Sequence, residues 1–299
     1  MPLKTKIGAF RARLERLRRI GSAGSGGRSQ RNAELDQPST KALAGLTELA
    51  DRAGSRHDTI VSLAPHPHPM KSLCIEERDF ESPVPDSAVK LFKIRFADSA
   101  GRRRSASFLV QRRYSWRGYH VRTPSAQHHN RVTLSAYDGN DVVATISVGY
   151  DSQSGLFVGA LFASELQTLR DRGGRICEFT KLAIDETIKS KPVLAALFHI
   201  AYIHARRIGS CTDLVVEVNP RHVRFYERML GFHALGAARM DPRVQAPATL
   251  LHLELSHAEA QIAEFGGKVE LAAQVRSLYP YFFSPHEEAG IEQRLRAYS

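Results

Sequence analysis

One segment of the chain predicts its own local structure almost residue by residue. Residues 131–151, RVTLSAYDGNDVVATISVGYD, contain two runs in which apolar and polar side chains alternate, separated by Asp-Gly-Asn-Asp at 138–141. Alternation with a period of two is typical of a half-buried β-strand, and a short loop of Asp, Gly and Asn joins antiparallel strands. The segment therefore predicts a β-hairpin, onto which the rest of the chain must build a sheet.

Strands and helices are predicted to alternate on both sides of this hairpin. Before it, the pattern predicts a strand at 89–98 and a helix within 105–121. After it, the predicted helices are 163–174, 191–209, the segment that follows Pro220, and 257–265, and the predicted strands are 175–185, 213–219 and 248–255. Pro192 in the first turn and Gly209 at the end mark the limits of the longest helix. This order predicts an α/β (α+β) fold, with a mixed central sheet and helices on both faces.

The first 87 residues differ in composition from the rest. The stretch 21–32 is rich in Gly and Ser, and the run APHPHPM at 64–70 has proline at alternate positions, which no helix accommodates. Seven Lys and Arg against one Glu give residues 1–20 a charge of 7 − 1 = +6. We therefore expect a basic, largely disordered extension over 1–87 and a folded domain with a C-terminal helical tail over 88–299.

Residues 3–20 allow two interpretations. As a helix they would carry a narrow apolar stripe between basic side chains, which suits contact with an anionic membrane or a partner protein. The same residues also suit a solvated tail that binds nothing. The sequence leaves both interpretations open.

The charge and the absence of long apolar runs restrict the class of protein. A formal net charge of +11 indicates an acidic partner, which could be nucleic acid, an anionic membrane or an acidic carrier protein. We find no recognised nucleic-acid motif, which makes nucleic acid the weakest of these. No apolar run approaches the roughly 20 residues of a bilayer span, and no apolar secretory segment begins the chain. We expect a cytoplasmic protein, with peripheral contact at the inner membrane surface as an option.

A known fold is indicated by the strand that ends in Asn219-Pro220 and by the helix after it. That helix carries Tyr226 and ends at Gly231-Phe232, and this arrangement resembles the GCN5-related N-acetyltransferase fold. A more specific resemblance, over about residues 88–290, is carried by the runs CEFTKLAID, VNPRHVRFYERMLGF, DPRVQAPATLLHLEL and SLYPYFFSP. These runs resemble the long-chain N-acyl amino acid synthases, which are relatives of the acyl-homoserine lactone synthases.

The resemblance implies both a fold and a reaction. It implies an acyl-CoA N-acyltransferase-like sheet that is splayed at its centre. The implied activity is that of a bacterial enzyme that transfers a long-chain fatty acyl group from an acyl carrier protein thioester to the amino group of an amino acid. The partners would be acyl carrier protein and the amino acid. No cofactor or metal is implied beyond the phosphopantetheine arm of the donor.

Glu178 is the candidate base that takes a proton from the amine. The strand of the lactone synthases carries Glu followed three positions later by Arg, and here the pair reads Glu178 and Lys181. Strict alternation puts these two on opposite faces, so both can line one site only if the strand is bulged or splayed. The alternative is an ordinary charged pair at the rim of a sheet.

Tyr226 and Asn219 are the candidates on the thioester side of the reaction. In acetyltransferases a tyrosine at the position of Tyr226 is the usual candidate for protonating the leaving thiolate. It also fits an apolar helix stripe with Val223 and Leu230, where tyrosine is a common structural residue. Asn219 suits contact with a pantetheine arm, a cap on the following helix, or both.

One departure from the acetyltransferases concerns the donor. Their central strand is followed by a glycine-rich turn whose amides hold the pyrophosphate of coenzyme A. Here the chain reads DETIKSKPVLAA at 185–196, with no glycine. The missing glycines disfavour free coenzyme A as the donor. Lys189 and Lys191 could instead meet the single phosphate of a carrier-bound pantetheine as charges.

The carboxylate of the amino acid calls for an arginine, because a guanidinium binds a carboxylate through two parallel hydrogen bonds. The resemblance makes Arg113 and Arg117 candidates, and Arg243 in DPRVQAP is a third. Two other functions stay open on the sequence alone. One is a non-catalytic nucleic-acid or membrane-surface adaptor on an acyltransferase fold, and the other is a coenzyme A-dependent N-acetyltransferase.

Overall fold

The computed structural model describes residues 58–64, 91–115, 130–186, 188 and 190–298. Contacts divide the chain into Met1–Arg52 and Ala53–Ser299, and all described residues belong to the second unit. The expected helix at 3–20, Arg117 and Lys189 lie outside the described residues. Among the residues that are described, no helix combines the length and the hydrophobicity that crossing a membrane requires.

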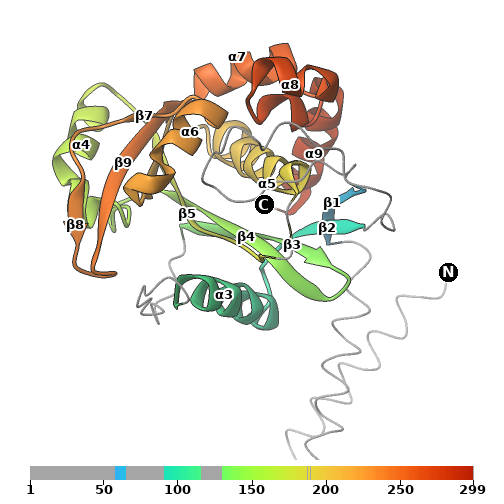
Figure 1. The fold of residues 1–299 in the computed structure, drawn as a ribbon, viewed down its shortest axis with the longest axis horizontal. Coiled ribbons are helices and arrows are strands. Elements are labelled where there is room, and N and C mark those ends of the chain that lie inside the picture. Colours follow the sequence, from blue (N-terminus) through green and yellow to red (C-terminus); the bar gives the residue numbers. More distant parts are fainter. Residues whose placement is uncertain (1–57, 65–90, 116–129, 187, 189, 299) are drawn as a thin grey trace, which may run out of the picture. The chain divides into compact units, whose positions relative to one another are not determined.

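The described part of the chain is built on one nine-stranded sheet (Figure 1). Its strands are β1 (Thr59–Leu63), β2 (Phe92–Phe96), β3 (Arg131–Asp138), β4 (Asp141–Tyr150), β5 (Ile176–Ile184), β6 (Asp213–Val218), β7 (His233–Ala234), β8 (Arg239–Asp241) and β9 (Ala246–Glu254). They are ordered β1-β2-β3-β4-β5-β6-β9-β7, with β8 paired to β9. Only β5 and β6 among these pairs run parallel, and they lie near the centre of the sheet. The predicted mixed sheet is confirmed.

The hairpin predicted at 131–151 is present as β3 and β4. Asp138 pairs with Asp141, and Gly139 between them has a φ of 60°, a conformation that costs glycine little. The middle of β4, from Val143 to Gly149, is buried on both faces of the sheet, because helices cover it from both sides. The hairpin therefore lies in the interior of the described fold, between the two layers of helices.

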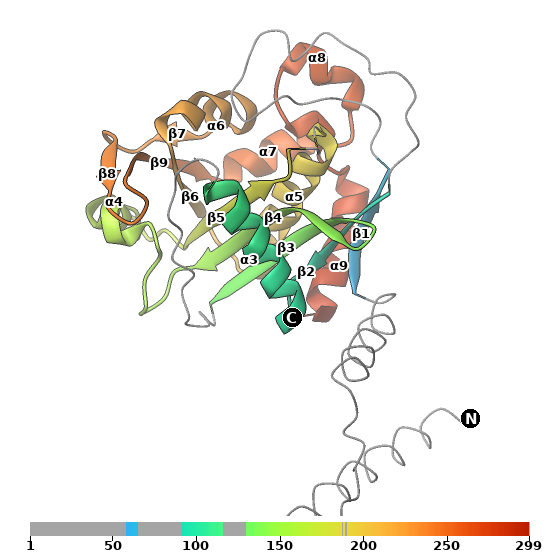
Figure 2. The same cartoon turned by 60° about the horizontal axis from the view of Figure 1, so that its bottom comes forward.

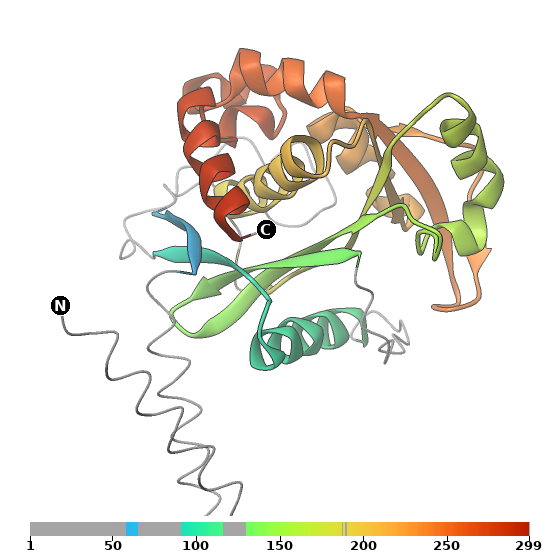
Figure 3. The ribbon, with the colours of Figure 1, turned by 180° about the vertical axis from the view of Figure 1, so that it is seen from behind.

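Helices cover both faces of the sheet. They are α3 (Ala100–Ser115), α4 (Gly159–Asp171), α5 (Lys191–Ile203), α6 (Val223–Leu230), α7 (Leu255–Phe265), α8 (Ala272–Val275) and α9 (Pro285–Tyr298). On one face α3 lies across β4 and β5, as Figure 2 shows. On the other face α5 packs on β3 and β4, and α9 packs on α5; both are seen from behind in Figure 3. The sheet is thus the middle layer of three.

Two boundaries differ from the expectation. The folded domain was expected to begin at residue 88, but β1 at Thr59–Leu63 pairs with β2, and Arg294 of α9 donates to the carbonyl of Ile60 at 2.8 Å. A five-residue strand near proline-rich sequence gives little periodic signal, which is why it was missed. The long helix expected at 191–209 is α5 continued by a π-helical turn, His204–Ile208, that ends at Gly209.

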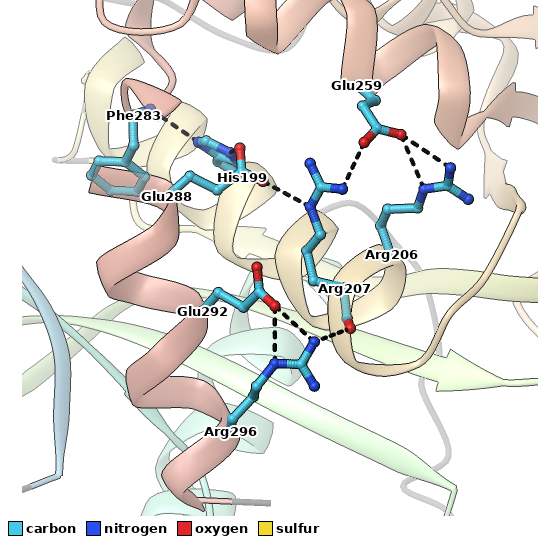
Figure 4. Close-up of polar contacts among 8 residues, drawn as sticks. All are labelled: His199, Arg206, Arg207, Glu259, Phe283, Glu288, Glu292 and Arg296. Atoms are coloured by element: carbon cyan, nitrogen blue, oxygen red, sulfur yellow. Dashed lines mark hydrogen bonds and ion pairs between the residues drawn. The ribbon is translucent and has the colours of Figure 1, made fainter. Parts of the chain in front are cut away.

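A buried polar cluster joins α5, α7 and α9 (Figure 4). Nδ1 of His199 accepts a hydrogen bond from the Phe283 N–H at 2.9 Å, so the ring proton is on Nε2. Nε2 donates a hydrogen bond to Glu288 Oε2, 3.1 Å away. Arg207 of the π-helical turn then pairs with Glu288 at 3.0 Å and with Glu259 at 2.6 Å. Burial lowers the pKa of His199 below its ordinary value, although Glu288 opposes this effect. The cluster anchors the predicted C-terminal helical tail against the helix behind the sheet.

Candidate active site

The sheet opens between its two parallel strands. β5 and β6 pair from Ile176 and Asp213 as far as Phe179 and Val216, although β5 continues to Ile184. The ladder therefore ends while both strands run on, and they diverge beyond that point. The splayed centre expected from the sequence is present.

A β-bulge lies just beyond the end of this ladder. Ser147 pairs with Thr180 but Thr145 pairs with Ala183, so Lys181 and Leu182 together face one residue of β4. Lys181 has a φ of 54°, in the left-handed region. A bulge of this kind breaks the alternation of side chains along a strand. The condition under which Glu178 and Lys181 can line one site is therefore met.

Glu178 is fully buried, with 0% of its side chain exposed, and each of its oxygens has a partner. Oε1 forms an ion pair with Nη2 of Arg131, and Oε2 accepts the Val158 N–H at 3.1 Å. The other terminal nitrogen of Arg131 donates to Thr180 Oγ1. The pair thus ties β3, β5 and the loop before α4 together on one face of the sheet.

Arg131 was not among the residues singled out from the sequence. It begins β3, and only the register across β4 brings it to Glu178, so no local pattern marks it. Its guanidinium carbon lies 4.0 Å from the ring centre of Phe157. Its Nε is buried, and none of the described residues accepts a hydrogen bond from it. A buried donor without a partner is unusual in proteins and often marks a functional site.

Lys181 adds a second positive charge beside Arg131. Burial lowers the pKa of Lys181, and the charge of Arg131 lowers it further. Within the described part of the chain, no residue forms a hydrogen bond or an ion pair with its ammonium group. Arg131 is thus paired with Glu178, whereas Lys181 lies beside Arg131 without a carboxylate of its own among the described residues, and a bound anion would relieve the repulsion between the two cations.

Arg243 reaches this region from the turn between β8 and β9. Its Nε and its backbone N–H both donate to Asp241 Oδ1 at 2.8 Å. Nη2 lies 2.7 and 2.9 Å from the two oxygens of Glu217, and Nη1 donates to the Phe157 carbonyl at 3.0 Å. Protein groups thus occupy Nε and both terminal nitrogens of Arg243, so these contacts do not support the predicted role as a carboxylate clamp.

Tyr226 projects from α6 into an aromatic cluster. Its ring packs edge to face on Phe198 at 6.1 Å and on Phe225 and Phe232 at 5.5 Å between ring centres. Burial raises the pKa of Tyr226, and Tyr114 of α3 raises it further. Tyr114 donates to the carbonyl of Leu182 in the bulge at 3.3 Å. Tyr226 is therefore a buried member of this aromatic cluster, in the electrostatic neighbourhood of Tyr114.

The remaining predicted residues have structural partners. Asn219 Oδ1 accepts the Arg221 N–H at 3.2 Å, and its Nδ2 donates to Pro247 O at 3.3 Å, so the capping role is present. Arg113 pairs with Glu186 at 3.1 Å, in the loop after β5. Lys191 is buried in the first turn of α5, whose N-cap is Ser190.

The comparisons with known proteins bear on this geometry. The sequence model of the N-acyl amino acid synthase FeeM family matches residues 105–254, half of the chain. This chain belongs to the FeeM family of N-acyl amino acid synthases. The matched span begins within α3 and ends with β9, so it contains the opened ladder, the bulge and the cluster around Arg131. The family expected from the sequence is confirmed, and with it an N-acyltransferase.

The solved structure of FeeM agrees with this family, and two others are similar to the chain at lower TM-scores. FeeM, an N-acyl amino acid synthase from uncultured soil microbes, is 25% identical, with a TM-score of 0.53 over 57% of this chain and 95% of its own. An N-acetyltransferase from Staphylococcus aureus Mu50 is 13% identical, with a TM-score of 0.40 over 55% of this chain and 98% of its own. Spermidine N-acetyltransferase from Vibrio cholerae is 13% identical, with a TM-score of 0.39 over 56% of this chain and 98% of its own. No curated protein matches the chain. The match to FeeM, with a TM-score above 0.5, confirms the acyl-CoA N-acyltransferase-like fold.

Proposed function

We propose that this FeeM-family enzyme transfers a long-chain fatty acyl group from an acyl carrier protein thioester to the α-amino group of an amino acid. The observation that supports this most is the pair of cations at the bulge. Lys181 lies beside Arg131, and of these two cations only Arg131 is paired with a carboxylate of the described residues, Glu178. The carboxylate of an amino acid would supply the missing negative charge and would hold the amine at the opening of the sheet.

The reaction needs little beyond positioning and proton transfer. The neutral amine attacks the thioester carbonyl carbon, a C–N bond forms, and the C–S bond breaks. The leaving thiolate takes a proton, for which the Tyr226 hydroxyl is the candidate donor. Glu178 holds Arg131 in place and thereby fixes the site for the carboxylate.

A carrier protein suits the chain better than free coenzyme A as the donor. The stretch 185–190 that joins β5 to α5 has no glycine, and α5 begins with Ser190 and Pro192 rather than with a glycine-rich turn. Such a start offers fewer free amides to a pyrophosphate. The net charge of +11 favours an acidic partner, and carrier proteins are acidic. Lys189 is retained in this proposal as a contact for the pantetheine phosphate, and residues 3–20 as a contact for an anionic membrane.

A product assay tests the proposal directly. The purified full chain is incubated with acyl carrier protein loaded with fatty acids of several lengths and with a mixture of amino acids, and N-acyl amino acids are sought by mass spectrometry. A parallel reaction contains the matching acyl-coenzyme A. We expect product from the carrier protein and much less from coenzyme A. Absence of N-acyl product with every donor would refute the function, and equal rates from both donors would refute the choice of donor.

A further inference from the structure

A second carboxylate faces the opening of the sheet, from the strand on its other side. We propose that Glu217, rather than Glu178, accepts the proton that the ammonium group of the acceptor must lose before its nitrogen can attack the thioester. The inference rests on the proposed acyl transfer to an amino acid, and it assigns the base of that reaction to β6.

The surroundings of Glu178 make it a poor base. Its side chain has no exposed surface, and both oxygens are held, one by the Arg131 guanidinium and one by the Val158 N–H. Taking a proton would leave the charge of Arg131 buried without its partner, which is costly in a protein interior. Glu217 also contacts an arginine, Arg243, but Arg243 is 41% exposed and keeps Asp241 as a partner when Glu217 is protonated. Glu178 is better described as a positioning residue for Arg131.

The register of the parallel strands places Glu217 on the same face as Glu178. Glu178 pairs with Val215, and Glu217 lies two residues further along β6, so it shares that face and lies past the point where the ladder ends. Its side chain is 17% exposed, so a substrate can reach it. Arg243 contacts both Glu217 and the carbonyl of Phe157, whose ring lies under Arg131. Glu217 and the two cations therefore border one region.

The charged groups around Glu217 and its burial set the pKa of its carboxyl group. Two charged residues of the described part of the chain face it: Asp241, at the end of β8, and Arg243, in the turn after β8. The carbonyl of Phe157 lies close to Arg243. Burial raises the pKa of Glu217 to about 7; Asp241 acts in the same direction, and Arg243 opposes both. Asp241 itself has a lowered pKa, despite its burial, because Arg243 donates to it twice. A base with a pKa near the working pH is the most effective one.

The proton and electron balance of the step is simple. The ammonium group of the bound amino acid gives one proton to the Glu217 carboxylate, and the freed lone pair forms the new C–N bond. When the tetrahedral intermediate collapses, the C–S bond breaks and the sulfur leaves as a thiolate, which is protonated at the thioester side. The second proton on nitrogen passes to water as the amide forms, and the proton on Glu217 then also returns to solvent.

Variants of Glu217 and Asp241 test the assignment. In the wild type, kcat/KM should fall as the pH drops below about 7, because the base becomes protonated. Glu217→Gln should lower kcat at pH 7 by about 100-fold or more, and activity should recover at alkaline pH, where the amine loses its proton without help. Asp241→Asn should shift the acid limb of the wild-type profile to lower pH, since Asp241 raises the pKa of Glu217.

Glu165→Gln is the matched control. Glu165 also pairs with an arginine, Arg239, and its side chain is likewise 17% exposed. It should keep the wild-type profile. A wild-type pH profile in Glu217→Gln, or alkaline recovery in Glu178→Gln instead, would overturn the assignment. If Glu217→Gln fails to fold, an unshifted acid limb in Asp241→Asn would overturn it. Lack of product with the wild type would instead refute the proposed acyl transfer itself.

Discussion

Gly149 on β4 lies directly opposite Glu178 on β5. A Cβ atom added to Gly149 would lie 2.8 Å from Nη2 of Arg131 and 3.0 Å from Cγ of Glu178. The first distance is shorter than real Cβ atoms show, the second is tighter than most of their contacts, and the ion pair that the Cβ would displace is buried. Only glycine leaves room here for the ion pair that fixes Arg131.

Gly149→Ala should therefore damage both stability and activity. We expect the free energy of unfolding to fall by about 1–3 kcal/mol, as for other overpacked interiors, and kcat/KM to fall because Arg131 moves. Urea denaturation and the product assay measure the two effects. Gly290→Ala in α9 is the control, since its nearest contact would be 3.7 Å. It should be neutral or slightly stabilising, and equal behaviour of the two variants would refute the steric argument.

Local patterns predicted much of the fold. The β3–β4 hairpin and α5 were predicted because side-chain periodicity and turn residues specify them within about 20 residues of sequence. β1 was not predicted, because a strand of five residues is stabilised by its partner β2 and by α9, which come later in the chain. The sequence also placed the start of α3 at residue 105, five residues after its start at Ala100.

The site was less predictable than the fold, because it depends on register. The sequence predicted that Glu178 and Lys181 can line one site only if their strand is bulged or splayed. The structure has a bulge at this place in β5. Arg131 and Glu217 were missed, since their proximity to the site follows from strand pairing and from the end of the β5–β6 ladder. Arg243 was predicted to bind substrate, but its position in the β8–β9 turn brings it to Asp241 and Glu217 instead.

Lys181→Met should weaken binding of the amino acid without changing the reactivity of the thioester. A charge-assisted hydrogen bond contributes about 1.5–3 kcal/mol, so we expect KM for the amino acid to rise about 10- to 100-fold. The wild type should use the corresponding amine, which lacks the carboxylate, poorly. With this amine as acceptor, Lys181→Met and the wild type should have the same KM. Lys181→Arg keeps the charge and should keep most of the affinity. An equal defect with both acceptors would show that Lys181 does not bind the carboxylate.

The variant Tyr226→Phe distinguishes a catalytic role of Tyr226, as a proton donor, from a purely structural role. If the hydroxyl protonates the leaving thiolate, kcat should fall about 10- to 100-fold with an alkyl thioester and recover with an aryl thioester, whose thiolate needs no proton. Thermal stability should change little, because the aromatic packing of the ring is retained. Tyr279→Phe is the control, since it loses a hydroxyl that donates to Leu230 O at 2.7 Å. It should lose about 1 kcal/mol of stability and show no dependence on the leaving group.

The buried histidines of α5 and the π-helical turn should make the protein sensitive to acid. Burial lowers the pKa of His204 to about 4, and that of His199 also lies below 6.5. The unfolded chain therefore takes up protons on both residues at a higher pH than the folded chain does, so stability falls as the pH drops below about 6.5. For His204 alone the loss reaches about 3 kcal/mol by pH 4.

Urea denaturation between pH 8 and pH 4 measures this loss as a slope. His204→Asn removes one titrating ring but keeps a polar group where Nδ1 meets Tyr150 Oη, so the slope should be shallower whatever the variant does to absolute stability. His286→Asn, at an exposed position of α9, should leave the slope unchanged. Glu288, whose pKa is lowered because His199 and Arg207 donate to it, adds a further loss below about pH 4.5. An unchanged slope in His204→Asn would show that His204 is not held neutral in the folded protein.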